Sequence, residues 1–261
     1  MSTQLSVLVS QTSLPNEQLL FGAAWIIGLC LIMVVVAQRA LAGHLPHVNR
    51  LEALDAMEMG IDRCVELGKP VYYEVSGARY GGDHGPMILA GISILGGVAR
   101  YAAEKGATMI ITYSAPQVLP AIEGQLKGVE EAVGKPGYFT DLQYLGSDAF
   151  SAAAVSMNTI EENDCMCSIA MGSASINILP IAEANRSKGC ICIEGTAYMS
   201  QIHALGLVTD YNLIGEQLYA AGAMYSKDPD TLSTLRINDI GKLTVIGLLP
   251  VLVAAVAGGV L

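Results

Sequence analysis

The sequence predicts an α/β protein with a mostly parallel, Rossmann-like sheet flanked by helices, and one transmembrane helix at each end. Along the middle of the chain, short segments rich in β-branched and aromatic residues alternate with longer helical segments. The first five strands start about 25 to 37 residues apart, which is the spacing of βαβ units. Two long uncharged runs lie near the two ends of the 261-residue chain.

Each predicted strand is a short run of residues with high β propensity. No two-residue Asn-Gly turn joins neighbouring strands, as it would in a hairpin. Each strand is therefore expected to cross over to a parallel neighbour through a helix. The strands are expected at residues 71–75, 108–113, 139–144, 165–171 and 190–194, with a weaker one at 207–209.

The helical segments occupy the intervals between these strands. They are expected at about residues 52–67, 86–104, 116–133, 148–160, 174–186 and 211–226. Residues 86–99 are uncharged but too short to span a bilayer, and Arg100 follows them. We expect a buried crossover helix whose glycines, Gly91, Gly96 and Gly97, let it lie close against the sheet.

The terminal runs have the length and composition of membrane spans. Residues 18–38 and 242–261 are each long enough to cross a hydrocarbon core of about 30 Å. Residues 1–17 contain no Lys or Arg, which favours an uncleaved anchor over a signal peptide. The alternative for the second run is a buried C-terminal helix.

The cations near the two spans predict their orientation. Arg39 and Arg50 follow the first span, Arg236 and Lys242 flank the start of the second, and the outer flanks carry no Lys or Arg. The positive-inside rule then places the central domain in the cytoplasm and both termini outside the cell membrane. The expected layout is an extracytoplasmic segment 1–17, a span 18–38, a linker 39–51, a cytoplasmic α/β domain 52–241 and a span 242–261.

The overall charge limits the class of partner. The formal net charge is −10, whereas a nucleic-acid-binding protein would present a basic face. We therefore expect no nucleic acid partner. The lipid bilayer is the expected partner of the two spans.

Polar and glycine residues follow several predicted strands. In a parallel sheet the carboxyl ends of the strands meet at one edge, where doubly wound proteins bind ligands. The same residue types are also common helix N-caps, so the alternative is purely structural. The candidate ligand-binding residues at this edge are Ser76, Gly77, Ser173, Glu194, Thr196 and Asp210.

The loop of residues 77–85 follows the first strand and precedes a helix, as a phosphate-binding loop would. Its sequence, GARYGGDHG, matches neither GxGxxG nor the P-loop. Asp83 and His84 are candidate polar ligands or an acid–base pair. The alternative is a turn with Asp83 near the helix start.

Four cysteines lie on two successive predicted strands, as Cys165-Met166-Cys167 and Cys190-Ile191-Cys192. Alternate residues of a strand lie about 6.6 Å apart, too far for two sulfurs on one tetrahedral zinc ion. We expect small buried hydrophobic side chains and no metal site.

Two acids mark the stretch LVTDYNLIGEQLYAAGAMYS at residues 207–226. Asp210 precedes the predicted helix, and Glu216 lies six positions later, about 240° around it, so the two acids share no face. Glu216 belongs to a stripe of small residues suited to close helix contact. Glu216, Gly222 and Ala223 are therefore candidate residues of an oligomer or packing surface.

Three stretches resemble an uncharacterised family of membrane-anchored prokaryotic proteins, a domain of unknown function. They are DYNLIGEQLYAAGAMYSKDP, LDAMEMGIDRCVELGKPVYYEVSG and the DIGK before the last span. The resemblance covers about residues 45–245. In that family a further glutamate commonly follows the second acid, where this chain has Gln217. The resemblance implies the two-part layout and supplies no reaction, cofactor or catalytic residue.

The sequence assembles no catalytic constellation, and it identifies no cofactor. The leading hypothesis is a membrane-anchored scaffold or accessory subunit that self-assembles, or joins other membrane subunits, through its α/β domain. The alternative is a membrane-tethered sensor or binding module that holds a nucleotide or other anionic metabolite at the strand-end edge. An enzyme that uses Asp83 with His84, or Asp210 with Glu216, is the third hypothesis.

Overall fold

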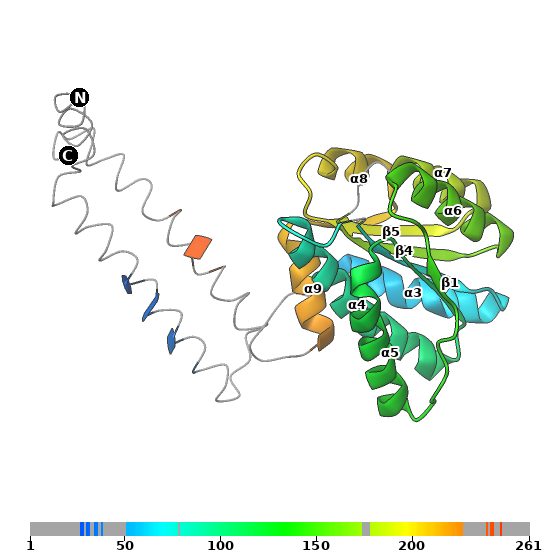
Figure 1. Ribbon diagram of the computed structural model, residues 1–261, viewed down its shortest axis with the longest axis horizontal. Coiled ribbons are helices and arrows are strands. Elements are labelled where there is room, and N and C mark those ends of the chain that lie inside the picture. The colour runs from blue at the N-terminus through cyan, green and yellow to red at the C-terminus, as the bar shows by residue number, and fades with distance from the viewer. Residues whose placement is uncertain are drawn as a thin grey trace. The chain divides into compact units, whose positions relative to one another are not determined.

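The structure is a computed structural model of the chain, and it divides into two compact units, residues 1–47 with 228–261 and residues 48–227. The second unit carries the α/β fold (Figure 1). The structure describes residues 51–77, 79–173 and 178–226, and isolated positions at 27, 28, 30, 31, 34, 35, 38, 239, 241, 242 and 246.

The described part of the chain holds a six-stranded sheet in the order β3-β2-β1-β4-β5-β6, and every printed pairing is parallel. This confirms the predicted α/β class and the parallel sheet. The chain starts in the middle of the sheet, builds outward to β3, and then returns to add β4 on the other side of β1. The strands are β1 (Val71–Ser76), β2 (Met109–Tyr113), β3 (Leu142–Tyr144), β4 (Cys167–Gly172), β5 (Ile191–Thr196) and β6 (Tyr211–Ile214).

Helices cover both faces of the sheet (Figure 1). One layer holds α3 (Glu52–Leu67), α4 (His84–Lys105), α5 (Leu119–Val133), which follows the short 3-10 helix η1 (Pro116–Val118), and α9 (Glu216–Ser226). The other layer holds α6 (Ala149–Glu162), α7 (Ile178–Lys188) and α8 (Ile202–Val208). This two-sided cover explains why the central strands are buried along their whole length.

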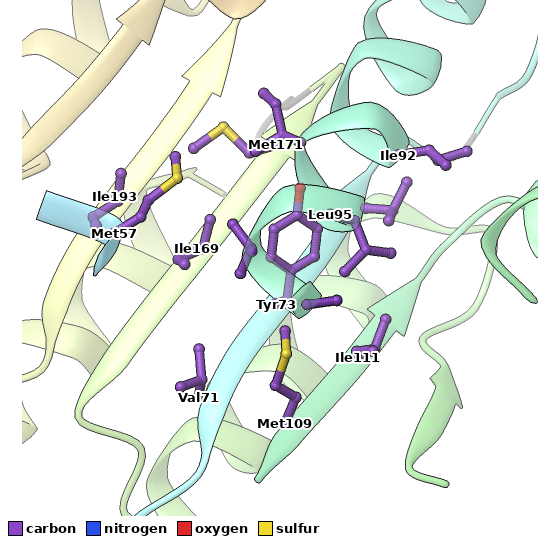
Figure 2. Packing of buried hydrophobic residues seen from close by; sticks show 14 of the residues in the cluster. Met57, Val71, Tyr73, Ile92, Leu95, Met109, Ile111, Ile169, Met171 and Ile193 are labelled. Atoms are coloured by element: carbon purple, nitrogen blue, oxygen red, sulfur yellow. The ribbon is translucent and has the colours of Figure 1, made fainter. Parts of the chain in front are cut away.

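The sheet face toward α3 and α4 is apolar. Alternate residues of the central strands, including Tyr73, Ile111, Ile169 and Met171, form one cluster of buried side chains (Figure 2). The hydroxyl of Tyr73 donates a hydrogen bond to the carbonyl oxygen of Gly91 on α4, at 2.6 Å. Each buried apolar side chain of this size contributes about 1.5–3 kcal/mol to folding, so this face holds most of the hydrophobic core.

Helix α4 is the buried crossover helix that the sequence predicts. Among the described residues it is the one helix whose length and hydropathy would allow a membrane span, but most of it is buried against β1 and β4. A Cβ added at Gly91 would lie 2.6 Å from the carbonyl oxygen of Met171 on β4. The missing side chain therefore lets the helix approach the sheet.

The prediction for the last part of the domain is wrong in its details. Residues 207–208 end helix α8 rather than forming a strand, and the strand follows at 211–214 as β6. Gly215, with a left-handed φ of 61°, separates β6 from α9, so the last helix begins at Glu216 and not at residue 211. The apolar residues of β6 fit a helical period as well as a strand period, which produced the error.

The two predicted spans lie largely outside the described residues. The positions described within residues 18–38 are helical, and Ile27, Leu31, Val34 and Val35 are exposed. Ile246, in the second predicted span, is also helical and exposed.

Candidate functional site

The candidate site lies where the strand order reverses, at the carboxyl ends of β1 and β4. These two strands pair from Val71 and Cys167 up to Ser76 and Gly172, and their connections leave toward opposite faces of the sheet. The backbone N–H of Ser173 donates to the carbonyl oxygen of Ser76 at 2.8 Å. In open α/β sheets this switch point is where the loops part and ligands bind.

Two glycines lie at this switch point, which we call the crevice after the position that it occupies in doubly wound sheets. Gly77 has a φ of 133° and Gly172 a φ of 137°, a region that residues with a Cβ rarely occupy. A Cβ at Gly172 would collide with the carbonyl oxygen of Ser76, and a Cβ at Gly77 would lie 2.9 Å from the side chain of Ile88. Close packing, against Ile88 and Ser173 at Gly77 and against the backbone of Ser76 at Gly172, therefore requires glycine at both strand ends.

One side-chain hydrogen bond joins the two sides of the crevice. Nδ1 of His84, the first residue of α4, lies 2.5 Å from Oγ of Ser173, which follows β4. Ser173 is buried, and His84 is partly buried. The ring of His84 also packs against that of Tyr198, with the centroids 5.3 Å apart. A small molecule at the switch point would therefore meet an imidazole and a hydroxyl group.

Thr196 extends the same edge by one strand, because it pairs with Gly172 at the end of β5. Its Oγ1 accepts a hydrogen bond from the backbone N–H of Tyr198 at 3.2 Å, so this hydroxyl shapes the loop that carries Tyr198. The edge thus brings together five of the predicted candidates: Ser76, Gly77, His84, Ser173 and Thr196.

Glu194 lies deeper, inside the domain. In the pairing register it is aligned with Ala170 of β4 and, beyond Ala170, with Glu74 of β1. Both carboxyl groups are buried. Burial, and secondarily the nearby Glu74 carboxylate, raises the pKa of Glu194 to about 8. Glu194 is therefore mostly protonated at neutral pH.

A chain of hydrogen bonds surrounds Glu74. Thr112 Oγ1 donates to the hydroxyl of Tyr72 at 3.0 Å, and that hydroxyl donates to Oε2 of Glu74 at 3.1 Å. Ser156 of α6 donates to the same oxygen at 3.0 Å. Burial, and then the Glu74 carboxylate, raise the pKa of Tyr72 well above its usual value, so the hydroxyl stays a donor.

A second chain reaches Glu194 from α7. Asn185 Nδ2 donates to Sγ of Cys192 at 3.1 Å, and Cys192 donates to Oε1 of Glu194 at 3.6 Å. The sheet face toward α6 and α7 thus carries a buried polar layer, in contrast to the apolar opposite face. We use "polar layer" for Tyr72, Glu74, Thr112, Ser156, Ser168, Asn185, Cys192 and Glu194.

The sequence of the chain also matches a known protein family. Residues 11–259 match a family described as a domain of unknown function, DUF6754. The chain belongs to the DUF6754 family. This confirms the resemblance to an uncharacterised family. No curated protein and no solved structure matches the DUF6754 chain.

Two predicted candidates lie away from the crevice of the DUF6754 chain. Asp210 lies at the opposite edge, where its Oδ2 accepts from the backbone N–H of Cys192 at 2.9 Å, near the start of β5. It therefore holds β5 and the start of β6 together and does not border the switch point. Asp83 is exposed at the start of α4 and makes no side-chain capping bond.

Sequence reasoning missed Glu74 and Tyr198. Glu74 is a charged residue in the middle of VYYEVS, a strand buried along its whole length, and such a position is costly without partners. That cost was a usable signal. No signal in the sequence indicated Tyr198, because its place beside His84 depends on a contact between segments far apart in the sequence.

The cysteines of the domain are buried and free, as the sequence predicts for Cys165, Cys167, Cys190 and Cys192. Burial raises the pKa of Cys165 to about 12 and that of Cys64 to about 11. These thiols are therefore protonated. Among the described residues, no group of three or more His, Cys, Asp and Glu side chains could hold a metal ion.

The predicted oligomer surface on α9 is already covered within the chain. Gly222 and Ala223 are buried, and a Cβ at Gly222 would lie 3.2 Å from Cβ of Ser93 on α4. Glu216 is exposed at the start of α9. The small residues of α9 therefore serve packing on α4, and they do not present a free surface for a second copy.

A cleft of about 640 Å³ lies among α3, α4, α5 and α9, on the face away from the polar layer. Arg100, Glu104 and Gln125 line it, together with Met224 and Tyr225. Opposite charges in its wall give it no clear preference for an anion or a cation. The switch point, where the side chains of His84 and Ser173 meet, is the candidate that we retain.

Proposed function

We propose that this member of the DUF6754 family is a membrane-tethered binding module that holds an anionic small molecule, such as a nucleotide, at the switch point between β1 and β4. The observation that carries the proposal is the His84–Ser173 hydrogen bond, which joins the start of α4 to the end of β4 at the switch point, where Gly77 and Gly172 have positive φ. Crevices of this kind are the usual ligand sites of doubly wound sheets.

The groups around the crevice favour an anion. Helix α4, 22 residues long, begins at the crevice and has no acidic residue in its first turn, so its positive dipole end faces this edge of the sheet. Hydroxyl and imidazole groups there can donate hydrogen bonds to phosphate or carboxylate oxygens. Arg79, exposed in the loop that precedes α4, is the cation nearest in sequence.

The tether is the second part of the proposal. Residues 18–38 and 242–261 have the length and composition of spans, and the described apolar side chains within them are helical and exposed. With one span at each end, the binding domain would lie on the cytoplasmic side, as the flanking cations indicate.

A ligand panel tests the proposal. The full chain, purified in detergent, is heated with inorganic phosphate, AMP, ADP, ATP or NAD⁺, and the melting temperature Tm is measured for each. A ligand that binds the folded state raises Tm. We expect the rise to be lost in His84→Ala and in Ser173→Ala, since both variants remove a group of the crevice.

Two matched variants serve as controls. His203→Ala removes an exposed histidine of α8, and Ser187→Ala removes a hydroxyl that bonds only locally, to the carbonyl of Ala184. Both should keep the ligand-dependent rise in Tm. An equal rise in the His84 variant and the wild type would contradict the proposed site.

A scaffold or accessory subunit of a membrane complex is the second candidate function. The observation that favours it is the set of large apolar side chains exposed on the α6–α8 layer: Phe150 of α6, Leu179 of α7 and Leu207 of α8. Exposed apolar groups of this size mark contact surfaces when they are contiguous. Replacement of Phe150 and Leu207 by Ser should then release a partner or a second copy in size-exclusion chromatography with light scattering.

A further inference from the structure

The cleft among α3, α4, α5 and α9 has the size of a small-molecule site. Its volume of about 640 Å³ falls in the range of about 300–1,000 Å³ that is usual for ligand pockets. Helix α4 packs against α5 and against α9, which are drawn beside it in Figure 1, and α3 completes the wall. The cleft therefore belongs to the α/β domain, on the other face of the sheet from the polar layer.

Two glycines of α4 let side chains from α5 and α9 reach the backbone of this helix. A Cβ at Gly96 would collide with the side chain of Gln125 on α5. A Cβ at Gly97 would collide with the ring of Tyr225 on α9, whose hydroxyl also lies 4.0 Å from Sδ of Met57 on α3. Gln125 and Tyr225 therefore border the cleft at positions that packing on α4 fixes.

One part of the cleft wall is apolar. Leu54 of α3 and Val129 of α5 are buried. Met224 and Tyr225 of α9 are partly buried beside the cleft. Aliphatic, thioether and aromatic groups together form a surface that accommodates apolar groups of different shapes. A ligand with apolar side chains would therefore remove them from water here.

The other part of the wall carries opposite charges one helical turn apart, Arg100 and Glu104 of α4. Among the residues that the structure describes, neither side chain has a hydrogen-bond or ion-pair partner, whereas the neighbouring Lys105 pairs with Asp62 at 3.3 Å. On a helix, a basic residue placed four positions before an acidic one is the weaker order for an ion pair. Both charges are therefore available to a ligand.

We propose that this cleft binds a short apolar peptide of two or three residues through its two charged termini. Arg100 would take the carboxylate, because the guanidinium fork matches a carboxylate with two parallel hydrogen bonds. Glu104 would take the ammonium group. The apolar side chains of the peptide would lie on Leu54, Val129 and Met224.

The spacing and the balance of the charges suit a zwitterion of this length. Residues four apart on a helix have their Cβ atoms about 6 Å apart, and the ends of an extended dipeptide lie at most about 7 Å apart. Among the lining residues that the structure describes, Arg100 is the one cation, whereas Glu58 and Glu104 are acids. This balance disfavours a nucleotide, whose charges are all negative. A zwitterion meets a partner for each of its charges.

The peptide site is separate from the anion site at the switch point. His84 begins α4, and Arg100 lies 16 positions later on the same helix, which is about 24 Å at 1.5 Å per residue. Peptide binding should therefore survive His84→Ala, and a nucleotide-dependent rise in Tm should survive Arg100→Gln. Either site can be lost without the other.

Isothermal titration calorimetry of the full chain, purified in a non-ionic detergent, tests the site. The probes are dileucine and trileucine, together with N-acetyl-dileucine, which lacks the ammonium charge, and dileucine amide, which lacks the carboxylate. Dileucine or trileucine should bind the wild type. The two blocked peptides should bind it with a Kd about tenfold higher or more, and Arg100→Gln or Glu104→Gln should weaken dileucine binding by a similar factor.

A thermodynamic cycle between ligand and protein identifies which charge meets which residue. Dileucine amide should bind Arg100→Gln as well as it binds the wild type, because the ion pair is already absent. N-acetyl-dileucine should behave in the same way with Glu104→Gln. A merely structural role of Arg100 would instead weaken the binding of every peptide equally.

Two matched variants of α3 serve as controls. Arg63→Gln and Glu66→Gln, at exposed positions outside the cleft, should bind dileucine as the wild type does. The proposal would be overturned if neither peptide binds, if dileucine and its two blocked forms bind with equal affinity, or if Arg100→Gln leaves the Kd for dileucine unchanged.

Discussion

Gly91 of α4 lies directly against the carbonyl group of Met171 on β4: a Cβ added to Gly91 would stand 2.6 Å from that oxygen. The neighbouring atom is backbone, which cannot rotate away as a side-chain end could. This contact lets the longest described helix lie flat on the centre of the sheet, and it brings the start of α4, with His84, to the switch point.

Gly91→Ala should therefore destabilise the domain by about 1–3 kcal/mol, since overpacking displaces α4 from β4. The matched control is Gly124→Ala in α5, where a Cβ meets nothing within 4 Å. That substitution should stabilise the helix by about 0.5–1 kcal/mol. Chemical denaturation of the two full-length variants measures both effects, and equal changes of the same sign would contradict the packing argument.

Gly222→Leu distinguishes packing inside the chain from assembly between chains. A leucine there must displace Ser93 and the carbonyl of Ala90, so the free energy of unfolding should fall by about 1–3 kcal/mol at every protein concentration. Gly128→Leu, at an open position of α5, is the control and should have little effect. A loss of the oligomer in Gly222→Leu without a loss of unfolding free energy would favour an intersubunit role instead.

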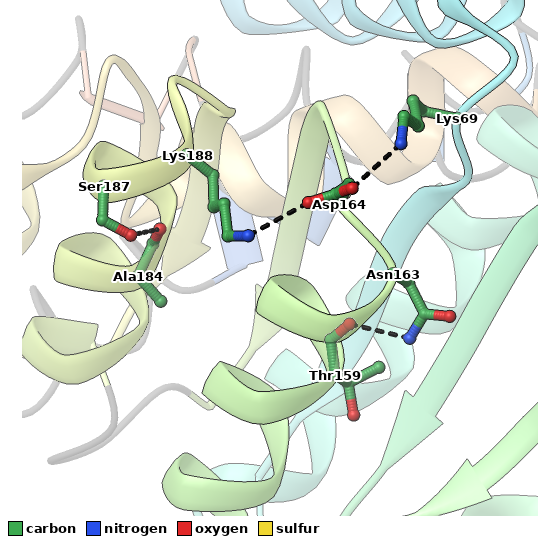
Figure 3. A network of polar contacts seen from close by, with 7 residues as sticks. All are labelled: Lys69, Thr159, Asn163, Asp164, Ala184, Ser187 and Lys188. Atoms are coloured by element: carbon green, nitrogen blue, oxygen red, sulfur yellow. Dashed lines mark hydrogen bonds and ion pairs between the residues drawn. The ribbon is translucent and has the colours of Figure 1, made fainter.

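Asp164 is predicted to make the stability of the domain depend on pH. Its carboxylate accepts from Lys69 and Lys188, each at 3.0 Å, and it lies at a positive φ of 49° between α6 and β4 (Figure 3). The hydrogen bonds and charges of the two lysines lower the pKa of Asp164 below its usual 3.8. A depressed pKa contributes stability above the usual value, and this contribution is lost as the pH falls through the folded-state pKa.

Asp164→Asn removes the charge and keeps a residue that tolerates positive φ. The variant should be less stable than the wild type at neutral pH, and the difference should shrink below the usual aspartate pKa of 3.8. The difference should also shrink with added salt, because the pair is partly exposed. Parallel pH profiles of the two proteins in thermal unfolding would contradict this role.

The buried cysteines should resist modification in the folded protein. N-ethylmaleimide reacts with thiolates, and burial both excludes the reagent and keeps these thiols protonated. Mass spectrometry should therefore find no label on the five buried cysteines under native conditions and label on all of them in denaturant. They are Cys64, Cys165, Cys167, Cys190 and Cys192, whereas Cys30 is exposed. Rapid native labelling of Cys192 would mean that the polar layer opens.

The alternation of strands and helices could be read from the sequence because its signals are local. Strand β1 and helix α4 carry their own apolar patterns, and the chain lengths between strands require crossovers. The error at β6 has the same origin: a four-residue edge strand beside a glycine carries too few residues to decide between two periods. Tertiary pairing with β5 decides it.

The candidate site could be predicted only in part. Ser76, Gly77 and Ser173 were expected at the carboxyl edge, because every parallel strand ends there. The polar layer could not be anticipated in the same way. A strand buried on both faces shows no alternation of polar and apolar residues that would reveal which face Glu74 occupies.

The sequence by itself therefore determined the α/β class, the parallel sheet, the buried character of α4 and the two apolar terminal runs. Only the tertiary structure decided that β4 lies beside β1, that His84 meets Ser173 across 89 residues of sequence, and that Glu74 and Glu194 share one row of the pairing register. The physical reason is the separation along the chain over which each effect acts. Periodicity and turn chemistry act over a few residues, whereas strand order and register depend on the packing of segments that are distant in the chain.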